Sequence, residues 1–231
     1  MIRLDGRNRY EIWDQSHTVL KLYEERAKAV AEEMTCAAQA AYLLEEISDA
    51  GDSLLDIGCG TGYFFHSLIK RKMYLEYWGL DACEKFISLG KKILPDFGLS
   101  SDRLICGRLE DLNSRVDHIL CMNVLSNLDN IHRPLERFLR MARKSVILRE
   151  SISECSNFSY VVDKYLNSVE PLRVHVNTYS RSEIDDLGRE HGFSCEFVQD
   201  WRTKGEPELV IDYPHYWQFV ILQPNVGSSN D

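Results

Sequence analysis

Leu54–Phe64, which reads LLDIGCGTGYF, is the stretch that decides the fold of this 231-residue chain. Its apolar first half has the composition of a parallel strand that is covered on both faces. The three glycines at every second position allow a tight turn and a close approach of the backbone to a ligand. A helix that follows offers free N–H groups and a partial positive charge at its start. The stretch therefore predicts a strand, a glycine-rich turn and a helix that together bind a nucleotide-like cofactor.

The spacing of the glycines separates two classes of cofactor. Gly58, Gly60 and Gly62 follow Asp56 as Asp-x-Gly-x-Gly-x-Gly, whereas a dinucleotide fingerprint reads Gly-x-Gly-x-x-Gly. Asp81 stands 21 residues beyond Gly60, at the end of the next strand-like run. An acidic side chain there can accept hydrogen bonds from both ribose hydroxyls of a nucleoside, although a helix cap is the simpler role. We prefer the ribose role, and the two motifs together favour S-adenosylmethionine over NAD.

Strand-like and helix-like segments alternate along the chain, which is typical of a doubly wound α/β protein. The pattern predicts strands at 53–57, 74–80, 103–106, 116–122 and 145–149, and helices at 63–71, 84–93 and 134–143. Ser180 is a suitable cap for a further helix that reaches His191, with Gly192 at its end. Two last strands follow at 193–201 and 215–222. We expect a mostly parallel seven-stranded sheet with helices on both faces and an antiparallel last strand.

The periodicity also predicts how the chain is divided. Amphipathic helices before the first strand indicate an N-terminal helical cap at residues 1–48. The cofactor-binding domain then covers 49–224. Within it, 150–179 is too long for a bare connector, so we expect a helix and a cover over the site, inserted after the fifth strand. The polar end at 225–231 is expected to be a disordered tail.

Composition argues against several partners. The formal net charge is -9 and the basic residues are scattered, whereas nucleic acid requires a concentrated basic face. We find no apolar run of membrane-spanning length and no hydrophobic signal core at the N-terminus. The seven cysteines include no Cys-x-x-Cys pair and resemble reduced core residues. We therefore expect a cytoplasmic protein that acts on a small molecule, with no nucleic acid, no membrane and no metal, since histidines and carboxylates do not cluster.

The two motifs resemble those of the class I S-adenosylmethionine-dependent methyltransferases of the small-molecule type, over about residues 50 to 150. Leu54–Phe64 matches the first motif of that family and Asp81 matches its ribose-binding acid. The resemblance implies a Rossmann-like methyltransferase fold, with S-adenosylmethionine as methyl donor and S-adenosylhomocysteine as product. It also implies a set of cofactor-binding residues: Asp56, Gly58, Cys59, Gly60, Asp81, Ala82, Arg108, Leu109, Glu110, Met122, Asn123, Tyr23 and Arg26.

Two parts of that set differ from the usual family pattern. Where the family has Gly-Asp-Ala-Glu-Asp-Leu after the third strand, this chain has Gly107–Leu112, GRLEDL. Arg108 replaces the usual aspartate, so its backbone and Leu109 are expected to hold the adenine. Glu110 is expected to accept from the exocyclic amine, or else belongs to an ordinary solvated turn.

The fourth motif, Asp117–Asn127, resembles the strand and turn beneath the methionine part of the cofactor, with Asn123 at the strand tip. Its sequence is not the Asn/Asp-Pro-Pro-Tyr tetrad of adenine-N6 and glutamine-amide methyltransferases, which argues against those substrates. Tyr23 and Arg26 lie one turn apart on an N-terminal helix and are expected to close over the methionine carboxylate. The alternative for Arg26 is a surface ion pair with a glutamate.

The residues that contact the methyl acceptor are expected outside these motifs. Methyl transfer is an in-line displacement, and a hydroxyl acceptor needs a base to take its proton. His175 is the first candidate base and Glu150, at the end of the fifth strand, is the second. Candidate substrate contacts are Trp13, Asn127, Tyr160, Asn177 and Tyr179. For His175 a surface ion pair, and for the tyrosines simple packing, are the competing interpretations.

These observations predict an enzyme that transfers a methyl group from S-adenosylmethionine to a small or medium polar molecule, at an oxygen atom. One alternative is a non-catalytic S-adenosylmethionine-binding regulatory protein, because Arg108 and Asn127 depart from the family pattern. A protein or RNA methyltransferase and an NAD-linked enzyme are the others. Binding of NAD without binding of S-adenosylhomocysteine would identify the last of these.

Overall fold

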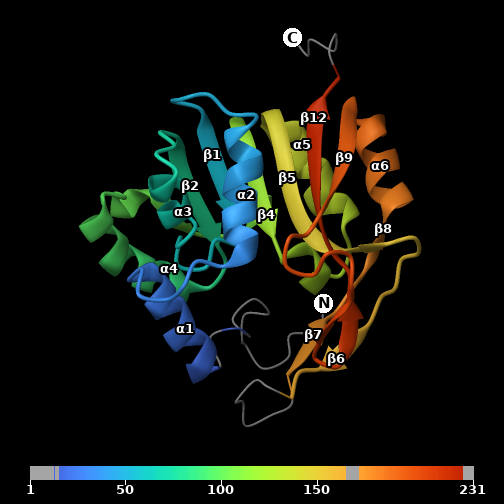
Figure 1. Cartoon of the computed structure of the whole chain (residues 1–231), viewed down its shortest axis with the longest axis horizontal. Helices are drawn as coiled ribbons and strands as arrows, with labels where there is room; N and C mark the ends of the chain where they lie inside the picture. The colour runs from blue at the N-terminus through green and yellow to red at the C-terminus, as the bar shows by residue number, and fades with distance from the viewer. Residues whose placement is uncertain (1–12, 14–15, 165–171, 226–231) are drawn as a thin grey trace.

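The computed structural model describes residues 13, 16–164 and 172–225, and its centre is one mixed sheet (Figure 1). Seven strands lie in the order β3-β2-β1-β4-β5-β12-β9, and β8 pairs with the end of β5. Only β12 runs antiparallel to its neighbours β5 and β9. This confirms the predicted doubly wound sheet with an antiparallel last strand. The bounds are β1 Ser53–Ile57, β2 Glu76–Asp81, β3 Leu104–Cys106, β4 Val116–Met122, β5 Ala142–Ser153, β8 Tyr179–Ser180, β9 Phe193–Gln199 and β12 Trp217–Pro224.

The apolar run of β1 explains its central place, because both faces of this strand are covered. Leu54 packs in one hydrophobic cluster, and Leu55 and Ile57 pack in the other, on the opposite face of the sheet. β1 pairs in parallel with β2 and with β4. The strand order therefore reverses between β1 and β4, and ligands of such sheets bind outside the carboxyl ends of the strands at that point.

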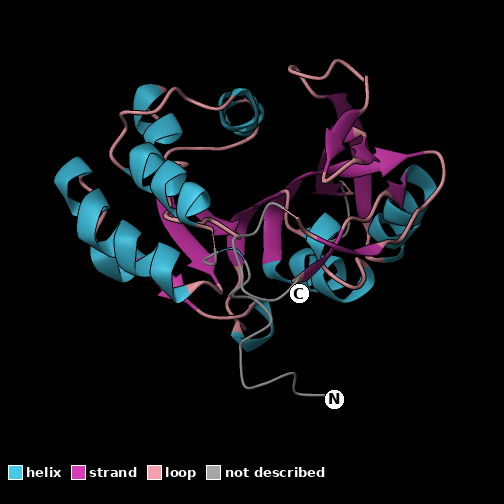
Figure 2. Cartoon of the chain, turned by 90° about the horizontal axis from the view of Figure 1, so that it is seen from below, coloured by secondary structure: helices cyan, strands magenta, loops and turns pink. Residues whose placement is uncertain are grey.

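Helices cover both faces of the sheet (Figure 2). On one face lie α2 (Thr35–Glu45), α3 (Phe65–Lys70) and α4 (Glu84–Ile93), which share a core with Leu54, Leu120 and Ile147. On the other lie α5 (His132–Met141) and α6 (Arg181–Glu190), packed on Ile119 and Val146. Short 3-10 helices form at η2 (Leu94–Phe97), η3 (Ser101–Arg103), η4 (Leu109–Asp111) and η5 (Leu125–Asn127). α1 (His17–Ala27) lies at the carboxyl edge of the sheet instead (Figure 1).

The predicted start and end of α6 are confirmed by its cap geometry. Ser180 Oγ accepts a hydrogen bond from the backbone N–H of Glu183 at 3.1 Å, which is the N-cap bond expected of a serine. Gly192, just beyond the helix, has φ 76°, the left-handed conformation that suits glycine at a helix end.

The cover after β5 differs from the helix that we expected. In its described part, β6 (Tyr160–Val162) pairs antiparallel with β7 (Arg173–His175). The physical reason is the period of the apolar residues: Val161 and Val174 pair across the hairpin on its packed face, and Val174 and Val176 alternate along the chain. That spacing suits a strand with one buried face, not a helix.

A second hairpin, β10 (Glu208–Val210) and β11 (Tyr213–His215), precedes β12 and supports the first one. Its two-residue turn consists of Ile211 and Asp212, with φ 51° and 67°. Positive φ is a true outlier for a β-branched residue. Ile211 nevertheless packs against Val174 and Val176, so contact with the first hairpin holds the turn in this conformation.

α2, which lies within the expected N-terminal cap, shares the core of the sheet through its buried face. The division at residue 48 stays a prediction. The expected tail, apart from Asn225, lies outside the described residues, as do positions 1–12 and 14–15 of the expected cap.

Membrane, redox and metal features can be assessed for the described part of the chain. No helix there is long and apolar enough to cross a bilayer. All seven cysteines are described and carry thiols without a disulfide. No group of three or more histidine, cysteine or carboxylate side chains among those residues is placed to hold a metal ion.

Candidate active site

The turn after β1 is held between two other segments of the chain. Gly58, Gly60 and Gly62 have φ 73°, 58° and 78°, conformations that L side chains rarely adopt. A Cβ at Gly58 would lie 2.2 Å from Val124 Cγ2, and one at Gly60 would lie 2.3 Å from Tyr23 Cε1. The loop therefore requires glycine for its conformation and for the close approach of the loop after β4 and of α1.

Asp81 connects the ends of β1 and β2. Its Oδ2 accepts from the backbone N–H of Gly60 and its Oδ1 from that of Cys83, both at 2.8 Å. The second bond goes to the residue before the helix, and α4 has no side-chain cap, so the structure does not form the helix cap that we weighed against the ribose role. Each oxygen keeps a lone pair for a ligand. Burial raises the pKa of Asp81 to about 6, although the two backbone donors oppose the shift.

Asp56 differs from the ligand contact that we predicted. Its side chain is buried inside the sheet, where Oδ2 accepts from the Tyr77 hydroxyl at 2.8 Å. Burial raises the pKa of Asp56 to about 7. Cys59 is also buried, with its Sγ close to Gly79 in β2, and burial raises the pKa of its thiol. Asp56 supports the loop from beneath, and only the backbone of Cys59 faces the turn.

α1 covers the glycine loop from the side. Tyr23 stacks on Phe86 of α4 at 4.5 Å between ring centroids, and its carbonyl accepts from Thr61 Oγ1 at 3.2 Å. Burial raises the pKa of Tyr23 to about 12, so its hydroxyl stays protonated at neutral pH. Tyr23 therefore lies at the glycine loop, and its expected role toward the methionine carboxylate stays a prediction.

Arg26 lies beside the same loop. Its Cζ is 5.2 Å from the Tyr23 ring centroid and 5.3 Å from that of Tyr63. The two glutamates next to it on α1 pair instead with lysines, Glu24 with Lys28 and Glu25 with Lys21. Within the described residues, the expected alternative of an arginine–glutamate pair is therefore not formed, and the role of Arg26 toward the cofactor stays a prediction.

The segment after β3 lies beside Asp81, where the adenine is expected. The backbone N–H of Gly107 donates to the carbonyl of Asp81 at 3.0 Å. Arg108 and Glu110 are exposed, Leu109 is half-buried against the core, and Ala82 is half-buried after β2. These positions suit an adenine-binding edge and equally suit an ordinary solvated turn, so the roles of these residues toward adenine stay predictions.

Glu150 is not placed to act as a base, contrary to our expectation. Its side chain is fully buried, and Oε1 accepts from the backbone N–H groups of Val124 and Leu125 at 2.9 Å each. Oε2 accepts from Ser126 N at 2.9 Å and from Ser126 Oγ at 2.7 Å. Four donors occupy the carboxyl group, so Glu150 holds the loop after β4 in place.

The tip of β4 is held by residues on both sides. Asn123 has φ 59°, and its backbone N–H donates to the carbonyl of Arg149 at 2.8 Å. Arg149 Nη1 donates to Asn123 Oδ1, and Asn127 Nδ2 donates to the carbonyl of Asn123 at 2.8 Å. Asn127 therefore supports the backbone at the β4 tip, and its expected contact with substrate stays a prediction. Met122, half-buried, directly precedes Asn123.

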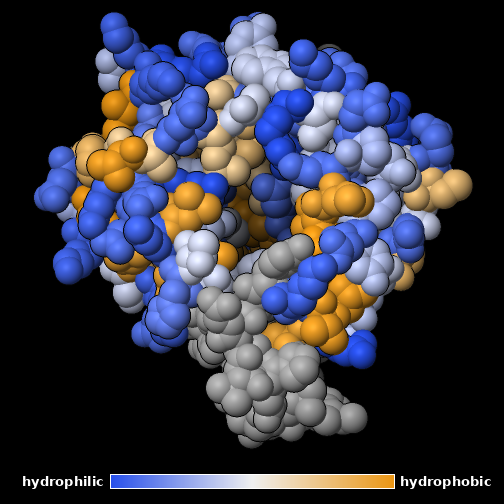
Figure 3. Space-filling model, turned by 60° about the horizontal axis from the view of Figure 1, so that its bottom comes forward, coloured by the Kyte–Doolittle hydropathy of each residue, from blue (hydrophilic) through white to orange (hydrophobic). Residues whose placement is uncertain are grey.

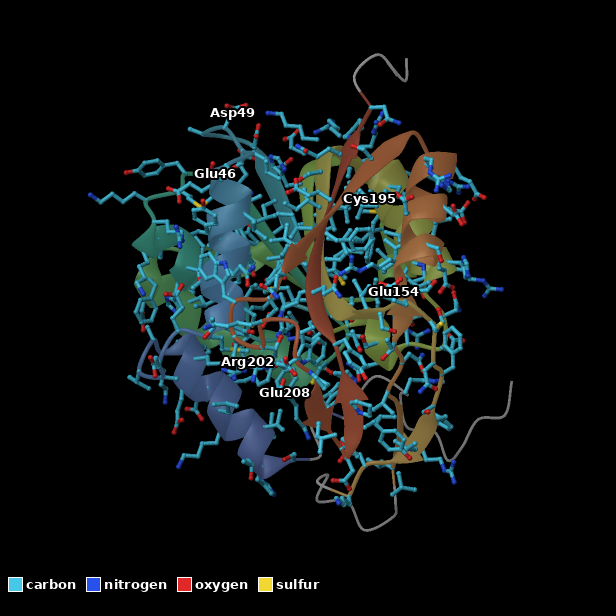
Figure 4. The ribbon with its side chains drawn as sticks, turned by 45° about the vertical axis from the view of Figure 1, so that its right-hand side comes forward. Glu46, Asp49, Glu154, Cys195, Arg202 and Glu208 are labelled. Carbon is cyan, nitrogen blue, oxygen red and sulfur yellow. The ribbon has the colours of Figure 1, made fainter. Side chains whose placement is uncertain are left out.

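Sequence reasoning missed Arg149, which is almost fully buried on β5. Its Nε donates to Asp200 Oδ2 at 2.7 Å and its Cζ lies 4.5 Å from the Trp217 ring centroid. Beyond them, Trp217 Nε1 donates to Glu208, which also pairs with Arg202. Figure 4 labels Arg202 and Glu208, which lie close together near the lower end of the sheet. The available signal was a charged pair, Arg149-Glu150, that interrupts an apolar strand at its carboxyl end.

Two predicted substrate contacts join the cover to the loop after β4 instead. Asn177 and Tyr179 are both fully buried. Asn177 Nδ2 donates to the carbonyl of Leu128 at 2.7 Å, and the Tyr179 hydroxyl donates to that of Leu125 at 2.8 Å. Both side chains thus donate to backbone carbonyls of a turn. They support the chain and are not the substrate contacts that we predicted.

Two of the three remaining acceptor candidates lie on the cover. His175 is half-buried and stacks on Tyr160 across the β6–β7 hairpin, with 4.6 Å between ring centroids. Tyr160 is about half exposed. Trp13 is half-buried, and its flanking residues lie outside the described part of the chain. The roles of these three residues stay predictions.

The carboxyl edge of the sheet is hollowed on its surface. Figure 3 shows a depression on this face with apolar residues at its floor and hydrophilic residues around much of its rim. The glycine loop after β1, Asp81 at the end of β2 and Asn123 at the tip of β4 lie at the point where the strand order reverses. Together they define the class of nucleotide-cofactor enzymes with a Rossmann-like fold.

Comparison with known proteins identifies the family within that class. A family model described as a methyltransferase domain matches residues 27–197, and the chain belongs to this family. The malonyl-[acyl-carrier protein] O-methyltransferase of Priestia megaterium (strain DSM 319 / IMG 1521) is 22% identical over 223 residues, which are 90% of this chain and 76% of that protein. The chain is thus an S-adenosylmethionine-dependent methyltransferase.

Solved structures agree with this fold. An S-adenosylmethionine-dependent methyltransferase from Clostridium acetobutylicum ATCC 824 superposes with a TM-score of 0.61 at 14% identity, covering 90% of this chain and 98% of that one. The magnesium protoporphyrin IX methyltransferase of Synechocystis PCC 6803, with bound SAM, gives 0.60 at 13% identity, covering 96% and 99%. The cofactor of this chain is S-adenosylmethionine, which becomes S-adenosylhomocysteine on methyl transfer.

Proposed function

We propose that this enzyme methylates an oxygen atom of a small or medium polar molecule. The observation that carries the proposal is the juxtaposition, at one edge of the sheet, of the glycine loop and Asp81 with a separate, polar β4 tip at Asn123. The first pair suits the donor, and the second lies where an acceptor must approach. The O-methyltransferase relative supports oxygen as the acceptor atom.

The chemistry asks the protein mainly for positioning. The sulfonium is already an activated leaving group, so the acceptor must be held in line behind the methyl carbon with water excluded. Asp81 and the glycine loop orient the donor, and the loop after β4, held by Glu150, supports the methionine end. A hydroxyl acceptor must also lose a proton, for which His175 is the remaining candidate base, whereas a carboxylate acceptor needs none.

The location and partners form part of the same proposal. We place the reaction in the cytoplasm with a small-molecule acceptor, which the seven cysteine thiols and the scattered basic residues support. The fold tolerates other acceptors, so a protein or RNA substrate and a non-catalytic regulatory role are outcomes that the experiment must separate.

Calorimetry with S-adenosylhomocysteine and with NAD tests the donor half. We expect binding of the first and none of the second. Turnover with radiolabelled methyl donor, against a panel of carboxylates, hydroxyls, amines, RNA and peptides, tests the acceptor half. Labelled product from amines, RNA or peptides only would contradict the proposal, and tight cofactor binding without any turnover would favour the regulatory alternative.

A further inference from the structure

Asn123 presents a fixed end of its amide group to the site. Its Oδ1 accepts from Arg149 Nη1. A guanidinium has only donors, so the oxygen end of the amide must face Arg149 and the nitrogen must be the opposite end. The backbone N–H and carbonyl of Asn123 are also bonded, to Arg149 and Asn127. Within the described residues Nδ2 has no bonded partner, so an N–H pair is the part of Asn123 left for a ligand.

Arg149 is too constrained to release this orientation. Its side chain is 2% exposed, it pairs with Asp200 Oδ2 at 2.7 Å, and it lies over the Trp217 ring. Asp200 is fixed in turn by the backbone N–H groups of Arg202 at 3.1 Å and Thr203 at 2.9 Å. Turning the asparagine would place two sets of N–H donors against each other in a buried setting, which is costly.

The position of Asn123 makes this orientation relevant to the acceptor. It directly follows β4, beside the point where strand order reverses, and the next residue, Val124, contacts the glycine loop at Gly58. Asn123 is half-buried, and its oxygen end is the end held inside the protein. The N–H end is then the one left for a ligand at the carboxyl end of β4, where such sheets bind ligands.

We infer that Asn123, oriented by Arg149, selects an oxygen acceptor over an amine. The inference rests on the proposed function and names its specificity-determining residue. An acceptor oxygen offers a lone pair to Asn123 Nδ2 in addition to the one that attacks. An amine that attacks with its only lone pair leaves N–H groups facing the N–H groups of Asn123.

The bond that breaks, the bond that forms and the proton are all accounted for in this methyl transfer. The S–C bond breaks with its electron pair kept by sulfur, and a lone pair of the acceptor oxygen forms the O–C bond. A hydroxyl gives its proton to a base, whereas a carboxylate has none to give. Asn123 transfers nothing and acts only as a donor, and Arg149 is a positioning residue because it acts through Asn123.

Sinefungin tests the inference without a known acceptor, since it carries a protonated amino group where S-adenosylmethionine carries the transferred methyl. We would measure the dissociation constants of S-adenosylhomocysteine and sinefungin by calorimetry. The wild type should prefer S-adenosylhomocysteine. Asn123→Asp, which keeps an acceptor for Arg149 and tolerates φ 59°, should shift the ratio toward sinefungin by at least about tenfold.

Two further variants keep the test decisive. Asn123→Gly removes the amide without backbone strain and should reduce the preference for S-adenosylhomocysteine. Arg149→Met frees the amide to turn and should shift the ratio in the same direction, which a purely structural role for Arg149 would not do. An unchanged ratio in Asn123→Asp or Asn123→Gly overturns the inference alone. Failure of the wild type to bind S-adenosylhomocysteine overturns the proposed function and the inference with it.

Discussion

The two halves of the carboxyl edge are built in different ways. Around β1 and β2, three glycines with positive φ form the turn, and each carboxyl oxygen of Asp81 accepts one backbone N–H and keeps a lone pair for a ligand. Around β4 and β5, by contrast, the polar groups of Glu150, Asn127, Asn177 and Tyr179 bond to the chain itself. The half of the edge where we propose the donor, called the donor half below, is therefore made of local sequence. The half where we propose the acceptor is a scaffold made of contacts between distant segments.

The largest effect should come from the scaffold. Glu150→Ala leaves three buried backbone N–H groups and the Ser126 hydroxyl without their acceptor, so we expect the free energy of unfolding to fall by about 3 to 5 kcal/mol. Urea denaturation measures this change. Glu154→Ala, one residue beyond the end of the same strand and with its side chain 89% exposed, is the matched control and should lose little. Equal losses would contradict the role of Glu150.

The donor half should respond in cofactor binding. Asp81→Ala removes the acceptor for the ribose hydroxyls, so binding of S-adenosylhomocysteine should weaken by about 1.5 to 3 kcal/mol, roughly ten- to a hundredfold. Calorimetry gives the dissociation constant. Glu84→Ala, an exposed carboxylate three residues away on α4, should leave it unchanged. An unaltered constant in Asp81→Ala would remove Asp81 from the cofactor site.

The raised pKa of Asp81 adds a dependence on pH. Burial places it at about 6 in the protein without ligand, and the charged carboxylate is the better acceptor. Below that pH the group takes up a proton that binding must displace. The dissociation constant of S-adenosylhomocysteine should therefore rise by roughly tenfold per pH unit below 6 and stay level above 7. Asp81→Asn should bind weakly with no such slope, and a level wild-type profile from pH 7 to 5 would refute the assignment.

The smallest effect concerns the cover. The His175 ring lies against the Tyr160 ring, with 4.6 Å between centroids and 34° between planes, and such a contact contributes about 0.5 to 1 kcal/mol, so losing it in His175→Ala should lower the free energy of unfolding by about that amount. Affinity for S-adenosylhomocysteine should not change. A loss of several kcal/mol in urea denaturation would show that His175 belongs to the scaffold as Asn177 and Tyr179 do.

The contrast between the halves also explains what could be predicted from the sequence. β1, β4 and α4 were predicted with their observed bounds, because their apolar periods and flanking glycines or caps are local signals. The same holds for the loop and for the place of Asp81 at the end of β2, since each is indicated by a short motif of its own. The helix expected after β5 was wrong, since the described part of that section forms the β6–β7 hairpin, and the alternation of Val174 and Val176 that favours a strand is only three residues long.

The roles of Glu150, Asn177 and Tyr179 escaped prediction for a related reason. Polar residues near a site look alike in a sequence whether they meet a ligand or a backbone carbonyl, and only the three-dimensional structure shows which. Arg149 and Asp200 are 51 residues apart, so nothing local in the chain indicates their pairing. The sequence shows only the charged pair Arg149-Glu150 directly after an apolar run.

The direction of β12 determines where new sequence can be added to this enzyme. Because β12 is antiparallel to its neighbours, it begins at the carboxyl edge of the sheet, whereas β5 and β9 end there. The connection after β5 and the connection before β12 both lie at that edge, and each contains a hairpin. A change in either hairpin therefore alters the surroundings of the carboxyl edge, while the glycine loop belongs to a different part of the chain.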